Sequence, residues 1–366
     1  MSPEDARFVV RLCAMTDSNL TMRAWRTHEY GRPTEVLRLD TVPVPEPDAG
    51  KLRVKVQAIP FNLNDLERIT GGNMMVRPEL PYSPGMEVMG VVDACGEGTE
   101  QWLGKRVVAM PEGAHGGFAE YAICTPVSTF EMPESVPLPG AAALYFPFHL
   151  AWLGLVDRAA LQPGESVLIH AAAGGAGSAA IQVAKRFGAR VFATAGTDAK
   201  VALCRELGAD VAVNYATSDF AEVVLAETNH DGVDVVFDNV GEAVMEASMK
   251  CTKYNGRYVM LGFASNKVVA DEPFIVPRRV ALGNMKLCGV MLAYADPEMW
   301  DFLKTAMGWN FVPRATGERA MREILEMVAN GAVKPVVGRV IGFEEIPEAI
   351  EALADRGTIG RTIVML

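Results

Sequence analysis

The sequence predicts an α/β protein in which a doubly wound parallel sheet is inserted into a β-rich domain. Residues 23–130 alternate between short apolar runs and turns with Pro or Gly, which is typical of β structure. Strand-like and helix-like runs then alternate from residue 166 to 289, which indicates a parallel sheet with helices on both faces. The chain ends in short strands that are too small to fold alone, so we expect them to complete the first domain.

The elements of the β-rich region follow from local pattern. Apolar and polar residues alternate over 51–57, as in a half-buried strand. Further strands are expected at 88–92 and 106–109, and the prolines of 43–47 favour an extended segment. Residues 1–21 precede the recognisable domain and are expected to form a poorly ordered extension.

The elements of the α/β region follow in the same way. A helical stretch is expected at 141–160, before the first strand of the series. Later strands are expected at 191–194, 211–213, 233–237, 257–261 and 285–289. Helices are expected at 199–207 and between the strand at 233–237 and residue 250. Two helices, 297–307 and 317–330, and two strands, 336–340 and 362–364, complete the chain.

A glycine turn between the strand at 167–169 and the following helix is the most informative motif. Its small residues are Gly174, Gly175, Ala176 and Gly177, and Ala172 stands where the usual G-x-G-x-x-G pattern begins with glycine. Glycines allow a close backbone approach, and the amides of a helix N-terminus favour a pyrophosphate. The motif therefore predicts a dinucleotide site, although tight packing of a helix on a strand without any ligand also explains it.

Composition limits the other functional classes. The net charge of −11, with no Lys- and Arg-rich run, argues against nucleic acid as the main partner. No uninterrupted apolar run is long enough to span a membrane. The six cysteines are scattered without a C-x-x-C pair, which favours free thiols and a cytoplasmic protein over a disulfide framework or a zinc lobe.

The position about 20 residues after the glycine turn distinguishes NAD from NADP, because NAD sites have an acidic residue there for the ribose 2′-hydroxyl. In this chain the count ends at Gly196, which leaves room for a 2′-phosphate. Thr197 can donate a hydroxyl and Lys200 a charge, whereas Asp198 would repel a phosphate if it pointed inward. We therefore expect NADP(H), with a merely solvated Lys200 as the alternative.

Several short motifs, taken together and in order, resemble those of one enzyme superfamily. They are Asn62-Leu-Asn-Asp65, Pro84-Gly-Met-Glu87, Gly116-Gly-Phe-Ala-Glu-Tyr121, Pro163-Gly-Glu165, Leu207-Gly-Ala-Asp210, Asp238-Asn-Val-Gly241 and Gly360-Arg361. Between Met22 and Leu366 the chain resembles the zinc-independent, quinone oxidoreductase-like group of the medium-chain dehydrogenase/reductases. The resemblance implies a GroES-like catalytic domain at 22–145 and 312–366, and a Rossmann domain at 146–311.

The resemblance also implies roles for individual residues. Asn62 would face the nicotinamide and the substrate, and Tyr215 would lie near the adenosine. The cofactor cleft would be lined by Asn239, Val240, Gly262, Phe263 and Ala264. Tyr145, Phe148 and Leu150 would line the acceptor pocket, although core packing explains these aromatic residues equally well.

The residue types at the family's zinc positions argue against a catalytic metal. Zinc-dependent relatives have Cys and His where this chain has Asn62 and Met86, and their third ligand falls near residues 145–148, which are aromatic or proline. Asn and Met are poor zinc ligands. Without a Lewis acid, reduction of an already polarised acceptor is favoured over alcohol oxidation.

The resemblance thus implies NADPH-dependent hydride transfer to a small-molecule acceptor, a quinone or an α,β-unsaturated carbonyl compound. Two alternatives remain: an enoyl-thioester reductase, for which Arg278-Arg279 is the candidate phosphate-binding patch, and a non-catalytic NADP-binding sensor or structural protein. Relatives of this kind are commonly dimers, and the apolar run 286–292 is an edge strand that a second copy could cover.

Overall fold

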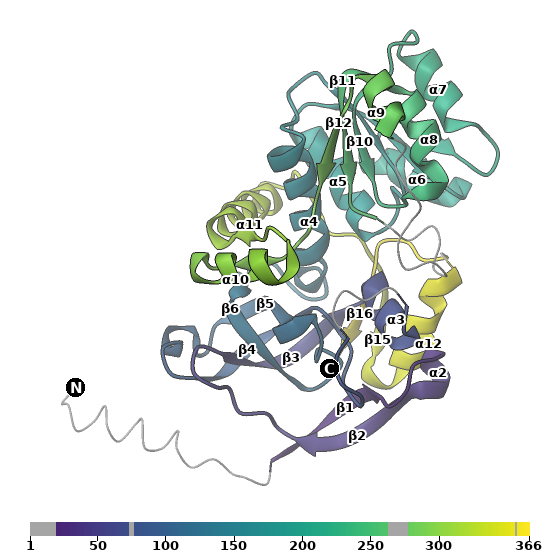
Figure 1. Cartoon of the computed structure of the whole chain (residues 1–366). Helices are drawn as coiled ribbons and strands as arrows, with labels where there is room; N and C mark the ends of the chain where they lie inside the picture. Colours follow the sequence, from purple (N-terminus) through teal and green to yellow (C-terminus); the bar gives the residue numbers. More distant parts are fainter. Residues whose placement is uncertain (1–19, 73–76, 263–276, 356) are drawn as a thin grey trace.

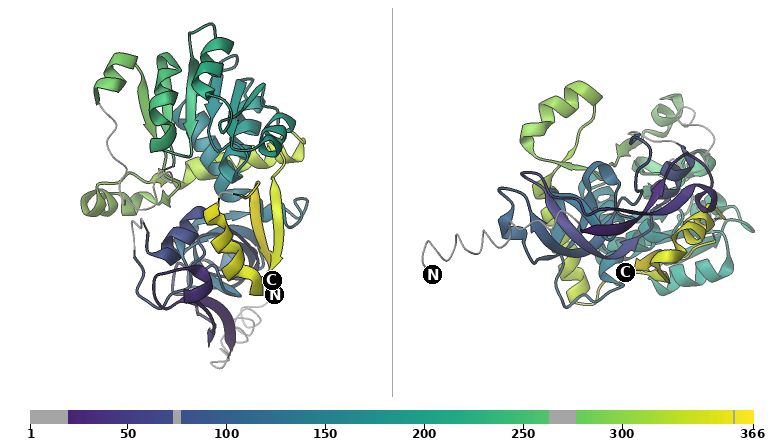
Figure 2. Two further views of the ribbon diagram at one scale, coloured as in Figure 1. Left: turned by 90° about the vertical axis from the view of Figure 1, so that its right-hand side faces the viewer. Right: turned by 90° about the horizontal axis from the view of Figure 1, so that it is seen from below.

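The computed structural model describes residues 20–72, 77–262, 277–355 and 357–366. It has two units, with the teal and green α/β unit above and the β-rich unit below (Figure 1). The yellow C-terminal segment lies back among the purple and blue strands of the lower unit, and the left view of Figure 2 separates the same two units. The predicted fold class, a Rossmann domain with a GroES-like β domain, is confirmed.

The lower unit is built on a six-stranded sheet of order β15-β16-β3-β4-β5-β6. Its strands are β3 (Leu52–Pro60), β4 (Val88–Cys95), β5 (Arg106–Pro111), β6 (Tyr121–Glu131), β15 (Val337–Gly342) and β16 (Arg361–Met365). β16 pairs antiparallel with β3, with Val364 opposite Ile59. The closing strands therefore complete the sheet of the first domain, because pairing with β3 satisfies their backbone groups.

Shorter elements surround this sheet. They are the hairpin β1 (Thr21–Thr27) and β2 (Leu37–Pro43), the helices α2 (Pro33–Val36), α3 (Leu63–Thr70) and α12 (Ile346–Glu351), and the 3₁₀ turns Glu100–Trp102, Glu112–Ala114, Phe343–Glu345 and Ala352–Asp355. The sequence pattern does not predict α2, α3 or α12, which are too short for a clear helical period. β1 begins inside the extension predicted for residues 1–21, whose first 19 residues lie outside the described part.

The upper unit is a parallel sheet of order β12-β11-β10-β7-β8-β9. Its strands are β7 (Ser166–Ile169), β8 (Arg190–Ala195), β9 (Val211–Asn214), β10 (Val233–Asp238), β11 (Thr252–Met260) and β12 (Lys286–Gly289). This is the doubly wound order: β8 and β9 follow on one side of β7, and β10 to β12 are added on its other side, so the strand order reverses between β7 and β10. Ligands of such sheets bind in the crevice at this point, beyond the carboxyl ends of the strands.

Helices α5 (Gly175–Arg186), α6 (Asp198–Glu206), α7 (Phe220–Glu227), α8 (Glu242–Lys250) and α9 (Pro277–Gly283) belong to this unit. The predicted helix at 141–160 is a 3₁₀ turn (Ala141–Ala143), α4 (Tyr145–Trp152) and a π-helical segment (Leu153–Arg158). β13 (Tyr294–Ala295), α10 (Pro297–Met307), β14 (Val312–Pro313) and α11 (Arg314–Ala329) lead back to the lower unit. No helix in the described ranges is long and apolar enough to cross a membrane.

Two histidines, His149 and His170, are fully buried. His149 lies in α4, where Nδ1 is 2.6 Å from the Tyr294 hydroxyl, and His170 follows β7. Burial lowers the pKa of each to about 3. Burial also raises the pKa of the Asp65 carboxyl to about 6, which has the opposite effect on stability.

We expect acid to destabilise the protein below pH 6.5. An unfolded histidine takes up a proton near pH 6.5, whereas the folded one resists protonation down to about pH 3. The free energy of unfolding therefore has its full value at neutral pH and falls by on the order of 4 kcal/mol per histidine as the pH drops from 6.5 to 3. Protonation of Asp65 in the folded protein partly offsets this loss between pH 6 and 4. Urea unfolding at several pH values measures the slope, and His149→Phe should flatten it. An unchanged slope in that variant would contradict the assignment.

Candidate cofactor and acceptor site

The glycine turn lies where the sequence predicts it, between β7 and α5. Gly174 precedes α5 with extended backbone angles, φ −79° and ψ −179°. A Cβ on Gly177 would lie 2.3 Å from the Ala171 carbonyl oxygen and 2.6 Å from the Ala172 Cα, so only glycine lets the helix start this close to the strand. Gly174, Gly175 and Ala176 are partly exposed, whereas Gly177 is buried. The turn thus presents the first helical amides at the surface.

The loop after β10 lies beside this turn. Asp238 is buried at the end of the strand, and its Oδ1 accepts hydrogen bonds from the backbone N–H groups of Val240 (2.7 Å) and Gly241 (3.0 Å). The Asn239 side chain donates to the His170 carbonyl oxygen over 3.3 Å, which joins the β10 loop to the end of β7. The glycine turn and the Asn239 loop, both predicted to bind the cofactor, therefore meet at the point where the strand order reverses.

Gly262 is the third backbone segment at this edge. A Cβ at this position would lie 2.2 Å from the Asn239 carbonyl carbon and oxygen, so a side chain is excluded by the neighbouring loop. The two predicted residues that follow, Phe263 and Ala264, lie outside the described residues.

His170 stabilises this edge as a neutral side chain. The Ser248 hydroxyl donates to the Val244 carbonyl oxygen (2.6 Å), so it accepts from His170 Nε2, which is 2.7 Å away. His170 Nδ1 then accepts from the Thr194 hydroxyl, at 2.9 Å. With both ring nitrogens engaged in this way, His170 serves a structural role.

The residues predicted for the adenosine end of the cofactor are brought together at the ends of β8 and β9. The Tyr215 hydroxyl lies 2.6 Å from where a Gly196 Cβ would be, so the phenol ring lies over the glycine. The Thr197 hydroxyl caps α6 by accepting from the Lys200 backbone N–H, at 3.3 Å. Lys200 follows in the first turn of the same helix.

Asn62 belongs to a buried polar network between the two units. Its side-chain amide donates to Glu87 Oε2 over 3.2 Å, and its backbone N–H donates to Asp65 Oδ2 over 2.9 Å. Glu87 is fully buried; its Oε1 accepts from the Phe146 backbone N–H (3.1 Å) and its Oε2 from Arg361 Nη2 (2.7 Å). Asn62 precedes α3, a helix that the sequence pattern did not predict.

Arg361 connects this network to the glycine turn. A Cβ on Gly175 would lie 2.6 Å from Arg361 Cδ, and Gly360 donates its backbone N–H to the Ala173 carbonyl oxygen over 2.8 Å. The Arg361 side chain is 5% exposed, and among the described residues its buried Nε and Nη1 have no hydrogen-bond partner. A cationic group with two unsatisfied donors beside a helix N-terminus fits a bound pyrophosphate.

The sequence does not predict these roles of Arg361, Glu87 and Asp238. All three stand in the motifs that carry the resemblance, but no local pattern predicts that residue 361 contacts residue 175 or residue 87. Only the charge type was a signal, because an ionised side chain among apolar residues needs a partner once it is buried.

The residues predicted for the acceptor pocket lie next to this network but are packed in the core. Tyr145 and Phe148 are 0% and 2% exposed, and Leu150 is partly buried against the same core cluster. The Tyr145 ring lies 5.2 Å from Phe130 and 4.8 Å from His149, centroid to centroid. Their role in acceptor binding stays a prediction.

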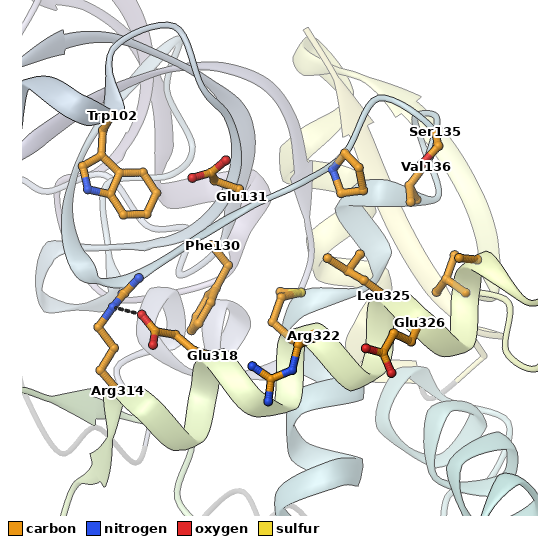
Figure 3. Close-up of a pocket in the computed structure, with 14 residues that line it drawn as sticks. Trp102, Phe130, Glu131, Ser135, Val136, Arg314, Glu318, Arg322, Leu325 and Glu326 are labelled. Atoms are coloured by element: carbon orange, nitrogen blue, oxygen red, sulfur yellow. Dashed lines mark hydrogen bonds and ion pairs between the residues drawn. The ribbon is translucent and has the colours of Figure 1, made fainter.

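One open cavity of about 740 Å³ lies elsewhere, along α11 (Figure 3). Its walls include Trp102 and Phe130 on one side and Arg314, Met321 and Leu325 of α11 on the other. None of its lining residues belongs to the predicted cofactor or acceptor site. This cavity therefore does not coincide with the predicted reactive cleft.

The chemistry of possible metal ligands is also limited. Asn62 and Met86 are 7% and 5% exposed, and the Asn62 amide is occupied by Glu87. Within the described ranges, no three His, Cys, Asp or Glu side chains are grouped closely enough to hold a metal ion.

Comparison with known proteins agrees with this arrangement. Residues 48–134 match the alcohol dehydrogenase GroES-like domain, and residues 175–306 match the zinc-binding dehydrogenase family. The chain is 31% identical to quinone oxidoreductase-like protein 2 of Bos taurus over 346 residues, 94% of this chain and 92% of that protein.

Solved structures are similar over nearly the whole chain. A quinone oxidoreductase of Pseudomonas syringae superposes with a TM-score of 0.81 at 26% identity, covering 94% of this chain and all of the other. A mycobacterial protein in complex with NADPH superposes with a TM-score of 0.78 at 28% identity, with the same coverage. The chain therefore belongs to the medium-chain dehydrogenase/reductase superfamily, as an oxidoreductase of the quinone oxidoreductase-like group.

Proposed function

We propose that this protein is a zinc-free, NADPH-dependent reductase of quinones or α,β-unsaturated carbonyl compounds. The observation that carries the proposal is the convergence of three segments at the switch point of the sheet. They are the glycine turn, the Asn239 loop and the Arg361–Glu87–Asn62 network. Together they join a dinucleotide cradle to a buried polar side chain of the other unit.

NADPH, when bound, supplies the hydride; the protein supplies position and a dry environment. The amides at 175–177 and the Arg361 guanidinium would hold the pyrophosphate, and Asp238 keeps the neighbouring loop in place. Glu87 orients both Arg361 and Asn62, because one carboxylate oxygen accepts from each. The buried rings of Tyr145 and Phe148 would exclude water near the acceptor. Solvent or a hydroxyl group of the pocket would supply the proton.

The adenosine end of the site supports NADPH over NADH. Gly196 has no carboxylate to hold a ribose 2′-hydroxyl, and Lys200 lies in the helical turn that follows. The mycobacterial relative with NADPH bound agrees with this preference.

Replacing Lys200 with Ala should weaken NADPH binding by on the order of tenfold, because a charge-assisted contact to the 2′-phosphate is lost. NADH binding should change little, since NADH has no such phosphate. Fluorescence titration with both cofactors measures the ratio of the two dissociation constants. If that ratio stays at its wild-type value, Lys200 is not the phosphate partner.

The proposal that no zinc takes part is supported by the donors at the family's metal positions. The Asn62 amide and the Met86 thioether are weak zinc ligands. Catalytic zinc sites use about three strong ligands from Cys, His, Asp or Glu. Metal analysis of the purified protein tests this point, and one tightly held zinc per chain would overturn it.

The proposed reaction is tested by following NADPH oxidation with quinones, enones and enoyl-CoA side by side. Turnover of quinones or enones is the expected result. Turnover restricted to enoyl-CoA would instead support an enoyl-thioester reductase. NADPH binding without oxidation by any acceptor would support a sensor or structural protein.

We further propose a cytoplasmic homodimer with no nucleic-acid or membrane partner. β12 is an edge strand, and Leu287 on it is 37% exposed. α10 follows and stands away from the body of the molecule in both views of Figure 2, with Phe302 61% exposed. Light scattering should give twice the chain mass, and Leu287→Glu should shift it toward the monomer. A monomeric wild-type protein at micromolar concentration would contradict this proposal.

A further inference from the structure

We infer that Asn214 is a specificity-determining residue that keeps the Asp198 carboxylate away from the 2′-phosphate position. The inference rests on the proposed NADPH site and explains how that site tolerates an acidic residue. Asp198 is the first residue of α6, two positions after Gly196, and is the nearest acidic residue in this loop. If the Asp198 carboxylate pointed toward the 2′-phosphate, it would repel that group.

A hydrogen bond fixes the position of the Asp198 carboxylate. Asn214 Nδ2 donates to Asp198 Oδ1 over 2.8 Å. The orientation of the Asn214 amide follows from its other contact, because Asn214 Oδ1 accepts the backbone N–H of Ala216 over 3.1 Å. With the oxygen so occupied, the NH₂ group faces Asp198.

The backbone of Asn214 is itself held firmly. Asn214 is the last residue of β9 and lies opposite Ala195 of β8. The next residue, Tyr215, donates its backbone N–H to the Ala195 carbonyl oxygen over 3.0 Å. The two strands therefore fix the backbone from which the Asn214 amide and the Tyr215 ring project. The end of β9 thus positions the Asp198 carboxylate through Asn214 and covers Gly196 with the Tyr215 ring.

The hydrogen bond does not remove the charge of Asp198 but fixes where it lies. A 2′-phosphate carries between one and two negative charges, so its repulsion by a carboxylate depends on their separation. Asp198 is exposed, so solvent screens this repulsion to about 1 kcal/mol at contact distance, which corresponds to about fivefold in affinity. Asn214 is accordingly a positioning residue, acting on the cofactor through Asp198.

A double-mutant cycle tests the inference with NADPH and NADH titrations of the full chain. Asn214→Ala should raise the NADPH dissociation constant about fivefold and change that of NADH less than about twofold. Asp198→Asn in the Asn214→Ala background should restore NADPH affinity. The gain in affinity should be larger in that background than in the wild type. The loss in Asn214→Ala should also shrink at high salt, which a purely structural role would not produce.

The outcomes separate this inference from the proposed function. If the wild type does not prefer NADPH over NADH, the proposed cofactor site and this inference both fail. If the wild type prefers NADPH but Asn214→Ala weakens both cofactors equally, only the inference fails. Equal effects of Asp198→Asn in the two backgrounds would likewise overturn it.

Discussion

Replacing Arg361 with Gln should weaken NADPH binding on the order of thirtyfold and also destabilise the fold. Two buried donors of the guanidinium, beside Gly175, have no partner within the described ranges, and charge-assisted contacts to a pyrophosphate contribute about 2 kcal/mol. The same change leaves Glu87 without its cation in a fully buried position. Breaking such a pair costs about 3 kcal/mol. Fluorescence titration and urea unfolding measure the two effects separately.

The double variant Glu87→Gln/Arg361→Gln separates folding from binding. Two neutral amides can hydrogen bond where the ion pair was, so we expect most of the lost unfolding free energy to return. NADPH affinity should stay low, because the cation is still missing. If the double variant binds NADPH like the wild type, Arg361 does not contact the cofactor.

Replacing Gly177 with Ala should damage both stability and cofactor binding. Its Cβ would lie 2.3 Å from the Ala171 carbonyl oxygen, which is backbone and cannot rotate away. The start of α5 must therefore move from β7. Overpacking of this kind costs about 1–3 kcal/mol, and the displaced amides no longer converge on one anion. Thermal unfolding and NADPH titration measure the loss.

Gly174→Ala is the matched control in the same turn. Of the residues that the structure describes, the nearest to a Cβ there is Ala171, whose carbonyl oxygen would be 3.3 Å away, and Gly174 has backbone angles that any residue adopts. Stability should therefore stay near wild type, whereas NADPH affinity should fall because the new methyl group faces the ligand. Unchanged NADPH binding in Gly174→Ala would favour the alternative in which the turn serves only helix packing.

Local pattern was sufficient for much of the fold. The strand–turn–helix unit at 166–186 and the strands after it follow from periodicity and glycine placement, and the structure confirms them. Short elements escaped because α3 and α12 span only about two turns. The strand at 257–261 was predicted too short, since β11 begins at Thr252, before the exposed Tyr254 and Asn255 break its apolar pattern.

The candidate site was predicted in part. Counting from the glycine turn identified Gly196, and the structure places Tyr215 over it. The exact boundaries of the domains at 145/146 and 311/312, and the acceptor pocket around Tyr145, stay predictions. No count along the chain could pair Asn214 with Asp198, because Asn214 ends β9 whereas Asp198 begins α6, and only the folded sheet brings them together.

The sequence by itself determined the class of sheet, the position of the dinucleotide turn and the absence of an acid at Gly196. These are local properties, set by residue type and spacing within one strand–turn–helix unit. The tertiary structure alone decided that Arg361 lies beside Gly175, that Glu87 joins it to Asn62, and that Asn214 holds Asp198. Such contacts form between segments that are distant in the chain, because burial in the folded core leaves each ionised or polar group dependent on the nearest partner in space.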